Sequence, residues 1–170
     1  MLKALVVIAQ EGYQDIELAG TRDGLEENNF EVVLASKEAG ECTGKFGGSE
    51  TAEVAMRDVD LDDYNRVAFI GGPGAVELDS DPDALHLANA TVRAGKPIGA
   101  ICVAPMILAK ARLLGGRKAT VWESPETLET FKKYGVEYTA EAVTVDGKIV
   151  TGNGPDAAVE FGKTIASRSF

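Results

Sequence analysis

The feature that most constrains the fold is a regular alternation of short, continuous apolar runs with amphipathic helical stretches. Such runs are typical of strands covered on both faces, because a strand of a buried parallel sheet has no solvent-facing side. Their alternation with helices predicts an α/β fold, in which a mostly parallel central sheet lies between helical layers. We expect strands at 3–9, 31–36, 66–70, 97–101 and 117–122.

Capping residues mark several of the helices. The segments that begin at Ser80 and Ser124 each place a capping side chain just before a proline in the first helical turn. In the first helix, Ile16, Leu18, Ala19 and Leu25 are the candidate inward-facing positions. We expect helices over 15–28, from Pro82 to about Arg93, over 103–114, over 124–134 and from Pro155 to the C-terminus.

Two segments depart from the alternation. Residues 40–56 are rich in Gly, Thr and Ser before becoming β-branched, which predicts a loop and a short hairpin. Residues 142–151 carry Asp146-Gly147 between alternating apolar residues, a strong hairpin signal. Internal repeats, low-complexity tracts and Pro/Ser-rich linkers are absent from the sequence, so we expect one domain over residues 1–170.

Charge and apolar content exclude several classes of function. The formal net charge is −10, from 27 acidic and 17 basic residues, so a basic nucleic-acid footprint is absent and binding to an anionic membrane is disfavoured. The apolar runs are shorter than the roughly 20 residues that span a bilayer, and the N-terminus predicts a first strand rather than a signal peptide. With only Cys42 and Cys102 present, we expect free thiols in a reducing cytoplasm.

Cys102 stands where a predicted strand runs directly into a predicted helix, among the small residues Gly99, Ala100 and Ala104. This is the layout of a nucleophile elbow, in which a sharp turn lifts the side chain above the sheet edge. The helix N-terminus would lower the pKa of the thiol, and free backbone N–H groups would hold an oxyanion or an oxidised sulfur. A buried structural cysteine is the alternative, and spacing alone leaves both open.

Two further segments follow strands at the same predicted sheet edge, where ligands of such folds bind. The turn Gly71-Gly72-Pro73-Gly74 would let backbone N–H groups approach a ligand, although a simple tight turn is the plainer interpretation. Glu17 lies in the first turns of a helix. Beside the elbow it would share a proton with Cys102 and act as a general acid or base; otherwise it complements the helix dipole.

The remaining candidates are weaker. His86, the single histidine, lies within a predicted helix, and nothing in the sequence places it near Cys102. Cys42 lies in a polar loop and is interpreted as incidental. Zinc-type spacings such as Cys-x-x-Cys are absent, so no metal is expected.

Taken together, the three segments resemble the PfpI (DJ-1) superfamily, with its flavodoxin-like three-layer sandwich related to class-I glutamine amidotransferases. The resemblance covers essentially the whole chain. It rests on the motifs ALVVIAQEGYQDIEL, FIGGPGA and GAICVAP, on the strand that ends at Trp122, and on TGNGP around Asn153.

This resemblance implies that Cys102 is the reactive cysteine and that Glu17 is the carboxylic acid hydrogen-bonded to it. It assigns the backbone amides of Gly72 and Val103 to an oxyanion site, and Gly71, Trp122 and Asn153 to the pocket lining. It also implies a cytoplasmic homodimer, or a larger assembly of dimers, that needs no cofactor.

Departures from the family pattern favour one activity. Peptidase-like members often carry a histidine after the cysteine, where this chain has Val103, and others carry one where it has Trp122. Some relatives place arginines on the first helix, where Glu26 and Glu27 stand here, which argues against an anionic substrate. We therefore expect a glyoxalase III or deglycase-like enzyme acting on small reactive carbonyls. The alternatives are a PfpI-type cysteine peptidase or amidase, and a non-enzymatic redox sensor or chaperone that uses oxidation of Cys102.

Overall fold

The structure is a computed structural model that describes residues 1–169. Its centre is a seven-stranded sheet in the order β11-β12-β8-β7-β1-β3-β6, in which every pairing is parallel except that of the edge strand β11 with β12. These strands are β1 (Leu2–Val7), β3 (Phe30–Ser36), β6 (Val54–Ala55), β7 (Arg66–Phe69), β8 (Ile98–Ile101), β11 (Val143–Asp146) and β12 (Ile149–Gly152). The predicted α/β architecture is confirmed.

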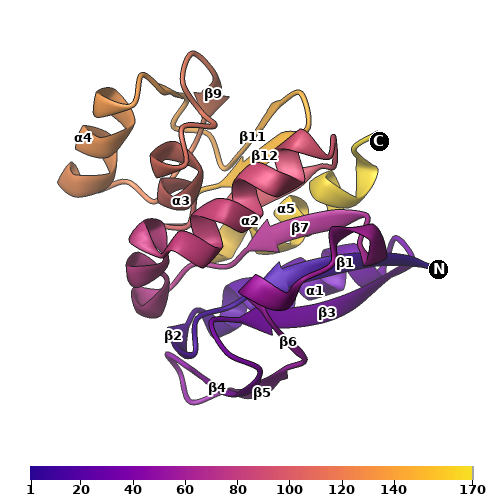
Figure 1. Ribbon diagram of the computed structural model, residues 1–170. Coiled ribbons are helices and arrows are strands. Elements are labelled where there is room, and N and C mark those ends of the chain that lie inside the picture. Colours follow the sequence, from indigo (N-terminus) through magenta and orange to yellow (C-terminus); the bar gives the residue numbers. More distant parts are fainter. Residues whose placement is uncertain (170) are drawn as a thin grey trace.

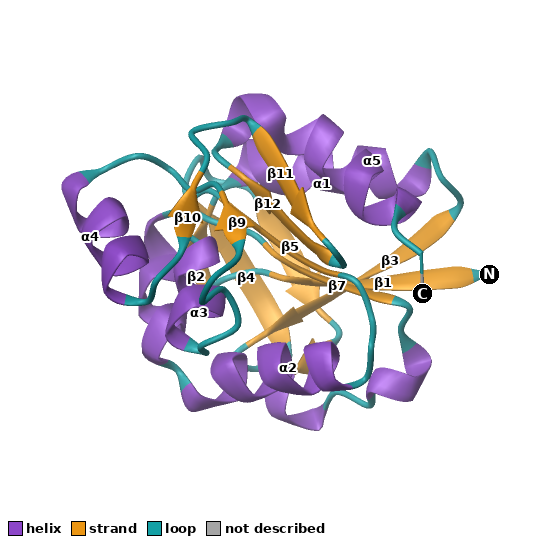
Figure 2. Cartoon of the chain, turned by 90° about the horizontal axis from the view of Figure 1, so that it is seen from above, coloured by secondary structure: helices purple, strands orange, loops and turns teal. Residues whose placement is uncertain are grey.

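Helices cover both faces of this sheet (Figure 1, Figure 2). Helices α1 and α5 lie together on one face, and α2 and α3 lie on the other, with α4 beyond them at one end. The helices are α1 (Asp15–Glu26), α2 (Pro82–Arg93), α3 (Pro105–Lys110), α4 (Pro125–Lys133) and α5 (Ala158–Ser167), and short 3-10 turns include η2 (Leu61–Asp63), η3 (Pro73–Ser80) and η4 (Pro155–Ala157). The result is the three-layer sandwich that the sequence predicts.

The two faces of β1 show why this sheet needs both helical layers. Leu5 and Val7 point into the core beneath α2 and α3, whereas Ala4 and Val6 point into the core beneath α1 and α5. All four side chains are fully buried. Since successive side chains of a strand point to opposite faces, an uninterrupted apolar run is satisfied only when both faces are covered.

Helix α1 buries a different stripe from the one predicted. Leu18 and Leu25 face inward as expected, but Ile16 is 53% exposed and Ala19 is exposed. Glycines take the inward positions instead, because α5 lies too close for a side chain: a Cβ on Gly24 would come within 2.6 Å of the Lys163 backbone nitrogen. The prediction assumed that apolar residues occupy the inward-facing positions of α1. The close packing of α1 against α5 requires small residues there instead.

Two other expectations about elements are corrected. The expected strand 117–122 is reduced to β9 (Lys118–Ala119), which pairs with β10 (Glu137–Tyr138) in a separate two-stranded sheet. The expected helix 103–114 is the short α3, since a turn intervenes after Cys102 and Arg112 adopts a positive φ of 64°.

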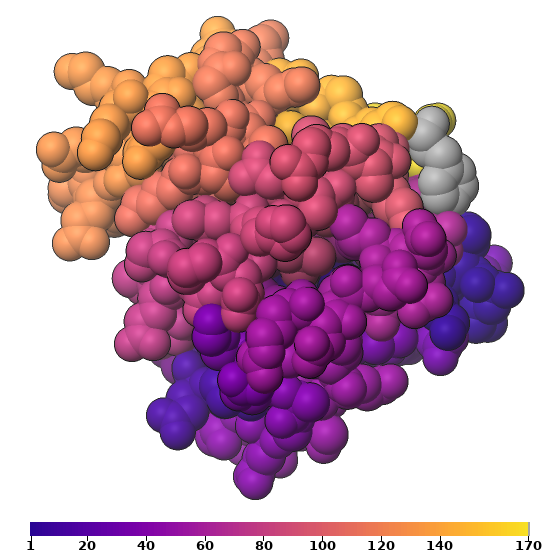
Figure 3. Space-filling view, viewed as in Figure 1, coloured from indigo at the N-terminus to yellow at the C-terminus, as the bar shows by residue number. Residues whose placement is uncertain are grey.

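Both predicted hairpins form. Residues 40–56 contain the antiparallel pair β4 (Gly40–Gly44) and β5 (Ser49–Ala52), and β2 (Glu11–Tyr13) joins β4 to make a small three-stranded sheet. Asp146-Gly147 turns β11 into β12. In the space-filling view the N-terminal and C-terminal thirds occupy the lower and upper parts of one face, with η3 and α2 between them (Figure 3). Among the described residues, no helix is both long and apolar enough to cross a membrane.

Candidate active site

Cys102 occupies a sharp turn at the carboxyl end of β8. Its φ is +64°, in the left-handed region that non-glycine residues rarely adopt. Hydrogen bonds hold the residue on both sides: its N–H donates to the Gly152 carbonyl at 2.9 Å, and its carbonyl accepts from the Trp122 N–H at 2.8 Å. A backbone conformation of this kind persists only where the surroundings fix it, and such residues cluster at functional sites.

Glu17 reaches this turn from α1. The Gln14 side chain caps the helix by accepting from the N–H groups of Ile16 and Glu17, which fixes where the helix begins. The Glu17 side chain is completely buried; its Oε1 accepts from the Gly71 N–H at 3.0 Å, and the side chain also interacts with the Cys102 thiol. The carboxyl group therefore lies in the interior beside Gly71 and the Cys102 thiol, and its Oε2 is buried without a geometric hydrogen bond to the described residues.

Gly71 is the position where the two side chains and the glycine turn meet. A Cβ on this residue would lie 2.5 Å from the Cβ of Cys102 and 2.8 Å from Oε1 of Glu17. Real Cβ atoms do not approach other atoms so closely, so only glycine leaves room for the thiol and the carboxyl group together. The glycine that follows β7 is required by packing at the site, and a simple turn does not account for it.

Two backbone N–H groups face the sulfur. Hydrogen bonds from Val103 and Gly72 favour the ionised form of the Cys102 thiol. Gly72 adopts a φ of +109°, and a Cβ there would lie 2.5 Å from the Gly12 carbonyl oxygen and 2.6 Å from the Gln14 nitrogen. The close approach of the Gly12–Gln14 segment thus holds the glycine turn in the shape that presents its N–H group to the sulfur.

Burial dominates the protonation of this pair. Desolvation raises the pKa of Glu17 to about 7, against weaker opposing effects of the hydrogen bonds with Cys102 and Gly71. Desolvation, followed by the negative charge of Glu17, raises the pKa of Cys102 to about 12. Because the pKa of Glu17 lies below that of Cys102, the carboxyl group loses its proton before the thiol does.

The pKa of the thiol corrects one sequence-based expectation. We expected the helix N-terminus to lower it, but α3 has six residues and begins only at Pro105. Burial outweighs the two facing N–H groups. Glu17 was expected to keep its proton because of burial and a like charge; burial does raise its pKa, but the Cys102 thiol acts in the opposite direction through a hydrogen bond.

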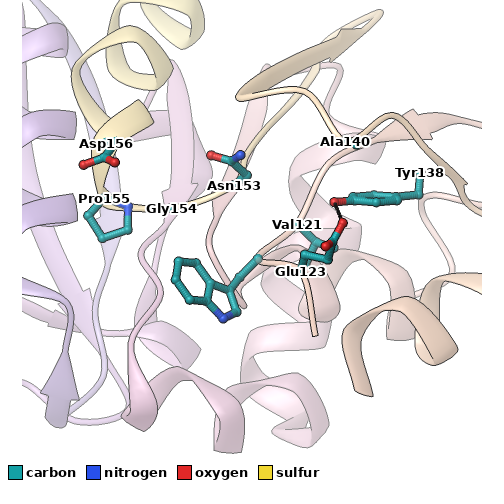
Figure 4. A pocket seen from close by; sticks show the side chains of 9 residues that line it. Val121, Glu123, Tyr138, Ala140, Asn153, Gly154, Pro155 and Asp156 are labelled. Carbon is teal, nitrogen blue, oxygen red and sulfur yellow. Dashed lines mark hydrogen bonds between the residues drawn. The ribbon is translucent and has the colours of Figure 1, made fainter. Parts of the chain in front are cut away.

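A cavity of about 360 Å³ lies beside the elbow (Figure 4). Trp122 and Asn153, which the sequence predicts as pocket lining, both border it, whereas Gly71, predicted with them, and Cys102 do not. Backbone hydrogen bonds join Cys102 to Trp122 and to Gly152, the neighbour of Asn153. Figure 4 shows Glu123 and Tyr138 at one side of the cavity, linked by a hydrogen bond of 2.9 Å.

On the other side of Asn153 lie Pro155 and Asp156 (Figure 4). Sequence reasoning missed Glu123, Tyr138 and Asp156 as lining residues. Glu123 and Asp156 could have been predicted as lining residues, because they lie close in the sequence to Trp122 and Asn153. Tyr138 had no such signal, because it arrives through the small β9–β10 pairing.

The other candidates lie elsewhere. His86 is exposed on α2, whose buried residues are Ala84, Leu87, Ala88 and Thr91, and no hydrogen bond among residues 1–169 joins it to Cys102. Cys42 is fully buried within β4 rather than in a polar loop, and both cysteines are free thiols. Over the same residues, no group of three or more His, Cys, Asp or Glu side chains is placed to hold a metal ion.

A sequence model described as the DJ-1/PfpI family matches residues 2–168. The chain belongs to the DJ-1/PfpI family. A solved ThiJ/PfpI domain protein from Brachyspira murdochii superimposes with a TM-score of 0.92 at 25% identity, covering 96% of this chain and 94% of that one. The fold and the family that the sequence motifs suggest are thus confirmed.

Relatives of this chain carry several names. An uncharacterized protein, MJ0967 of Methanocaldococcus jannaschii, is 38% identical over 161 residues, which cover 94% of this chain and 78% of the relative. Deglycase PfpI of Pyrococcus furiosus is 32% identical, with 91% of each chain covered. The putative cysteine protease YraA of Bacillus subtilis is also 32% identical, with 96% of each covered.

Proposed function

We propose that this protein is a cofactor-independent, cysteine-dependent enzyme that acts on small reactive carbonyls, in the manner of a glyoxalase III or deglycase. The observation that carries the proposal is the buried carboxyl group of Glu17 in contact with the Cys102 thiol. A thiol and a carboxyl group that share one proton near neutral pH supply both a nucleophile and a proton carrier. The deglycase names of relatives at 30–32% identity support the same class.

With methylglyoxal, the sulfur of Cys102 forms a bond to the aldehyde carbon, and the carbonyl electron pair moves to its oxygen. The thiol proton passes through Glu17 to that oxygen, giving a neutral hemithioacetal. The N–H groups of Gly72 and Val103 face this centre and stabilise the developing negative charge.

Glu17 then carries a proton from the sulfur-bearing carbon to the neighbouring carbon, while the hydroxyl proton moves to the neighbouring carbonyl oxygen. The product of this isomerisation is a lactoyl thioester. Attack by water breaks the carbon–sulfur bond, releases lactate and returns the proton to the sulfur. The net reaction is the addition of one water to methylglyoxal, with neither oxidant nor cofactor consumed.

Access to the sulfur favours small substrates. Cys102 is 8% exposed, which leaves room for a planar aldehyde more readily than for an extended peptide. The peptidase interpretation suggested by the name of YraA also requires a base. His86 lies exposed on α2, and the positions that carry histidine in peptidase-like relatives are Val103 and Trp122.

The test is lactate formation from methylglyoxal by wild type, Cys102→Ala and Glu17→Gln. We expect D-lactate from wild type, a loss of about 10²–10⁴-fold for Glu17→Gln as is usual for a general acid–base residue, and a larger loss for Cys102→Ala. Glu17→Asp serves as the matched control, because a partial activity there separates the need for a carboxyl group from a folding defect. Wild type without activity, or variants as active as wild type, would contradict the proposal.

The N–H groups of Gly72 and Val103 also favour a second candidate, redox sensing, because they would hold the oxygens of an oxidised sulfur. Mass spectrometry after mild peroxide treatment separates the two candidates. Selective gain of two oxygens at Cys102, with Cys42 unchanged and no carbonyl turnover, favours the sensor. Turnover of methylglyoxal by the reduced protein favours the enzyme.

A further inference from the structure

A second cavity, of about 230 Å³, lies at the end of the sheet opposite the elbow. Ile98 and Ile149, the first residues of β8 and β12, form part of its lining, whereas Cys102 follows the last residue of β8. The cavity is therefore separate from the proposed active site, and the function proposed above makes no use of it.

Three cationic side chains from separate segments line this cavity. Lys96 precedes β8, Arg117 precedes β9, and Lys148 lies in the hairpin turn between β11 and β12. The remaining lining residues carry no charge and comprise Val92, Gly95, Ile98, Gly147 and Ile149. A concave site with three positive groups and no acidic lining residue is unexpected in a chain whose net charge is −10.

The two lysines of this cavity are hydrogen-bonded to backbone carbonyls rather than paired with carboxylates. The Lys148 Nζ donates to the Gly95 carbonyl at 2.7 Å, and the Lys96 Nζ donates to the carbonyls of Leu61 and Tyr64, which ties down η2. A carbonyl oxygen satisfies a donor but carries no net charge. Of the ion pairs among residues 1–169, none includes either lysine.

Only Arg117 has an acidic partner. Its Nη1 lies 3.2 Å from Oδ1 of Asp146, whose other oxygen accepts from the Lys118 N–H at 2.8 Å. Lys148 thus has no carboxylate partner among the described residues, while Lys96 is hydrogen-bonded to η2, which carries Asp62 and Asp63. A lysine ammonium has three donors and an arginine guanidinium five, so Lys148 and Arg117 both retain donors for a ligand.

The charged atoms of these two side chains each lie near a glycine of the cavity lining. Two lining glycines have positive φ, and the nearest atom to a Cβ on Gly95 would be the Lys148 Nζ at 3.8 Å. For Gly147 it would be the Arg117 Nη1 at 3.7 Å. Each cationic group thus lies beside the backbone of a lining glycine, at ordinary contact distance from the position that a Cβ would take.

We propose that this cavity binds a small multivalent oxyanion carrying a phosphate group. The arginine fork and the lysine point charge are the two side-chain types that proteins use for phosphate. The apolar side chains of Val92, Ile98 and Ile149 lower the local dielectric constant, which strengthens the attraction. A long polyanion is disfavoured by the acidity of the rest of the chain, which leaves a small ligand as the occupant.

The test is calorimetric titration of the intact protein with inorganic phosphate and, separately, with glycerol phosphate, at low ionic strength. We expect saturable binding of one equivalent. Lys148→Gln and Arg117→Gln should each weaken it about tenfold, the cost of losing one charge-assisted hydrogen bond. Tighter binding of glycerol phosphate would assign the site to a phosphate monoester, and tighter inorganic phosphate to the free ion.

Lys132→Gln, which removes an exposed lysine of α4 that does not line the cavity, is the control of equal charge change and should bind as wild type does. Lys148→Arg keeps the charge and should retain binding, which distinguishes a lost ligand contact from a folding defect in Lys148→Gln. Absence of saturable binding, or equal weakening by Lys132→Gln, would overturn the proposal.

Discussion

The two cysteines of this protein are both free and both buried, yet their surroundings differ. Cys42 lies within regular β4 structure, where its sulfur is 3.7 Å from the Gly40 carbonyl oxygen and accepts from the Gln10 amide at 3.5 Å. Burial raises the pKa of its thiol. Cys102 stands in a strained turn, in contact with a buried carboxyl group and two backbone N–H groups.

Burial alone therefore does not distinguish the thiol that we propose to be reactive. Both sulfurs are desolvated and both have raised pKa values. What separates them is the buried carboxyl group of Glu17, which can exchange a proton with Cys102. Cys42 also has hydrogen-bond donors, since Ser36 and the backbone of Ala52 oppose the rise of its pKa, but it has no buried carboxyl group as a hydrogen-bond partner among the described residues.

The largest expected difference is in turnover. Cys102→Ala should lower the rate of lactate formation by about a thousandfold or more, because it removes the nucleophile. Cys42→Ala should leave the rate within about twofold, and should cost about 1–2 kcal/mol of stability through the small cavity that it creates. Steady-state kinetics and thermal unfolding of the two variants, side by side, measure both effects. An equal loss of activity in Cys42→Ala would contradict the proposal that Cys102 alone is the reactive thiol.

The second contrast is between glycines of the two regions. Gly71→Ala places a methyl group between Cys102 and Glu17, and displacement of either group by about 1 Å is expected to lower the rate about 100-fold. Gly47→Ala, in the β4–β5 turn, has a φ of +87° but no atom within 4 Å of the added methyl.

Gly47→Ala should therefore cost about 1–2 kcal/mol of stability from backbone strain and leave turnover unchanged. Measurement of kcat/KM and of the free energy of unfolding for both variants decides the matter. A full rate in Gly71→Ala would mean that the thiol and the carboxyl group do not need their present spacing.

The third expected difference concerns how the stability of the fold depends on pH. Glu17 has a pKa of about 7 in the folded chain against 4.5 when unperturbed, so the folded state binds the proton more tightly. The stability that this proton contributes is fully present below pH 4.5 and is lost as pH rises toward 7. The shift corresponds to about 3 kcal/mol between these limits.

Urea unfolding of wild type and Glu17→Gln at pH 4.5, 6 and 7.5 tests this linkage. The difference in unfolding free energy between the two should move in favour of the glutamine variant as pH rises. Cys42→Ala, which leaves Glu17 in place, should keep the wild-type slope. A Glu17→Gln variant with the same pH dependence as wild type would show that the carboxyl group is not desolvated as the structure indicates.

Much of the architecture follows from local sequence. The apolar run at the N-terminus could be satisfied only between two layers, and Ser124 before Pro125 opens α4 through a capping box with Thr127. Asp146-Gly147 turned the chain into a hairpin as predicted. In each case the governing interaction lies within a few residues of the chain, or within a single strand face, so the sequence displays it directly.

The predictions that were wrong concern contacts between different helices and strands. Ile16 is exposed on α1 although it is apolar, because α5 approaches the glycine stripe of the helix instead. The strand expected to end at Trp122 forms only as β9, outside the main sheet, because it pairs with β10 from a later segment of the chain. Contacts between elements determined both the exposure of Ile16 and the place of β9. Hydrophobic periodicity does not show which elements will pack against each other.

For the candidate site, the sequence by itself determined the residue types and the sheet edge where they stand: a thiol after one strand, a glycine turn after another and an acid in the first helix. Tertiary structure decided that Glu17, Gly71 and Cys102 meet, and that water is excluded around them. Exclusion of water is also what raises both pKa values, overriding the lowered thiol pKa that the local strand-to-helix pattern predicts. Desolvation is a property of all the elements that surround a group, and only the folded chain brings them together.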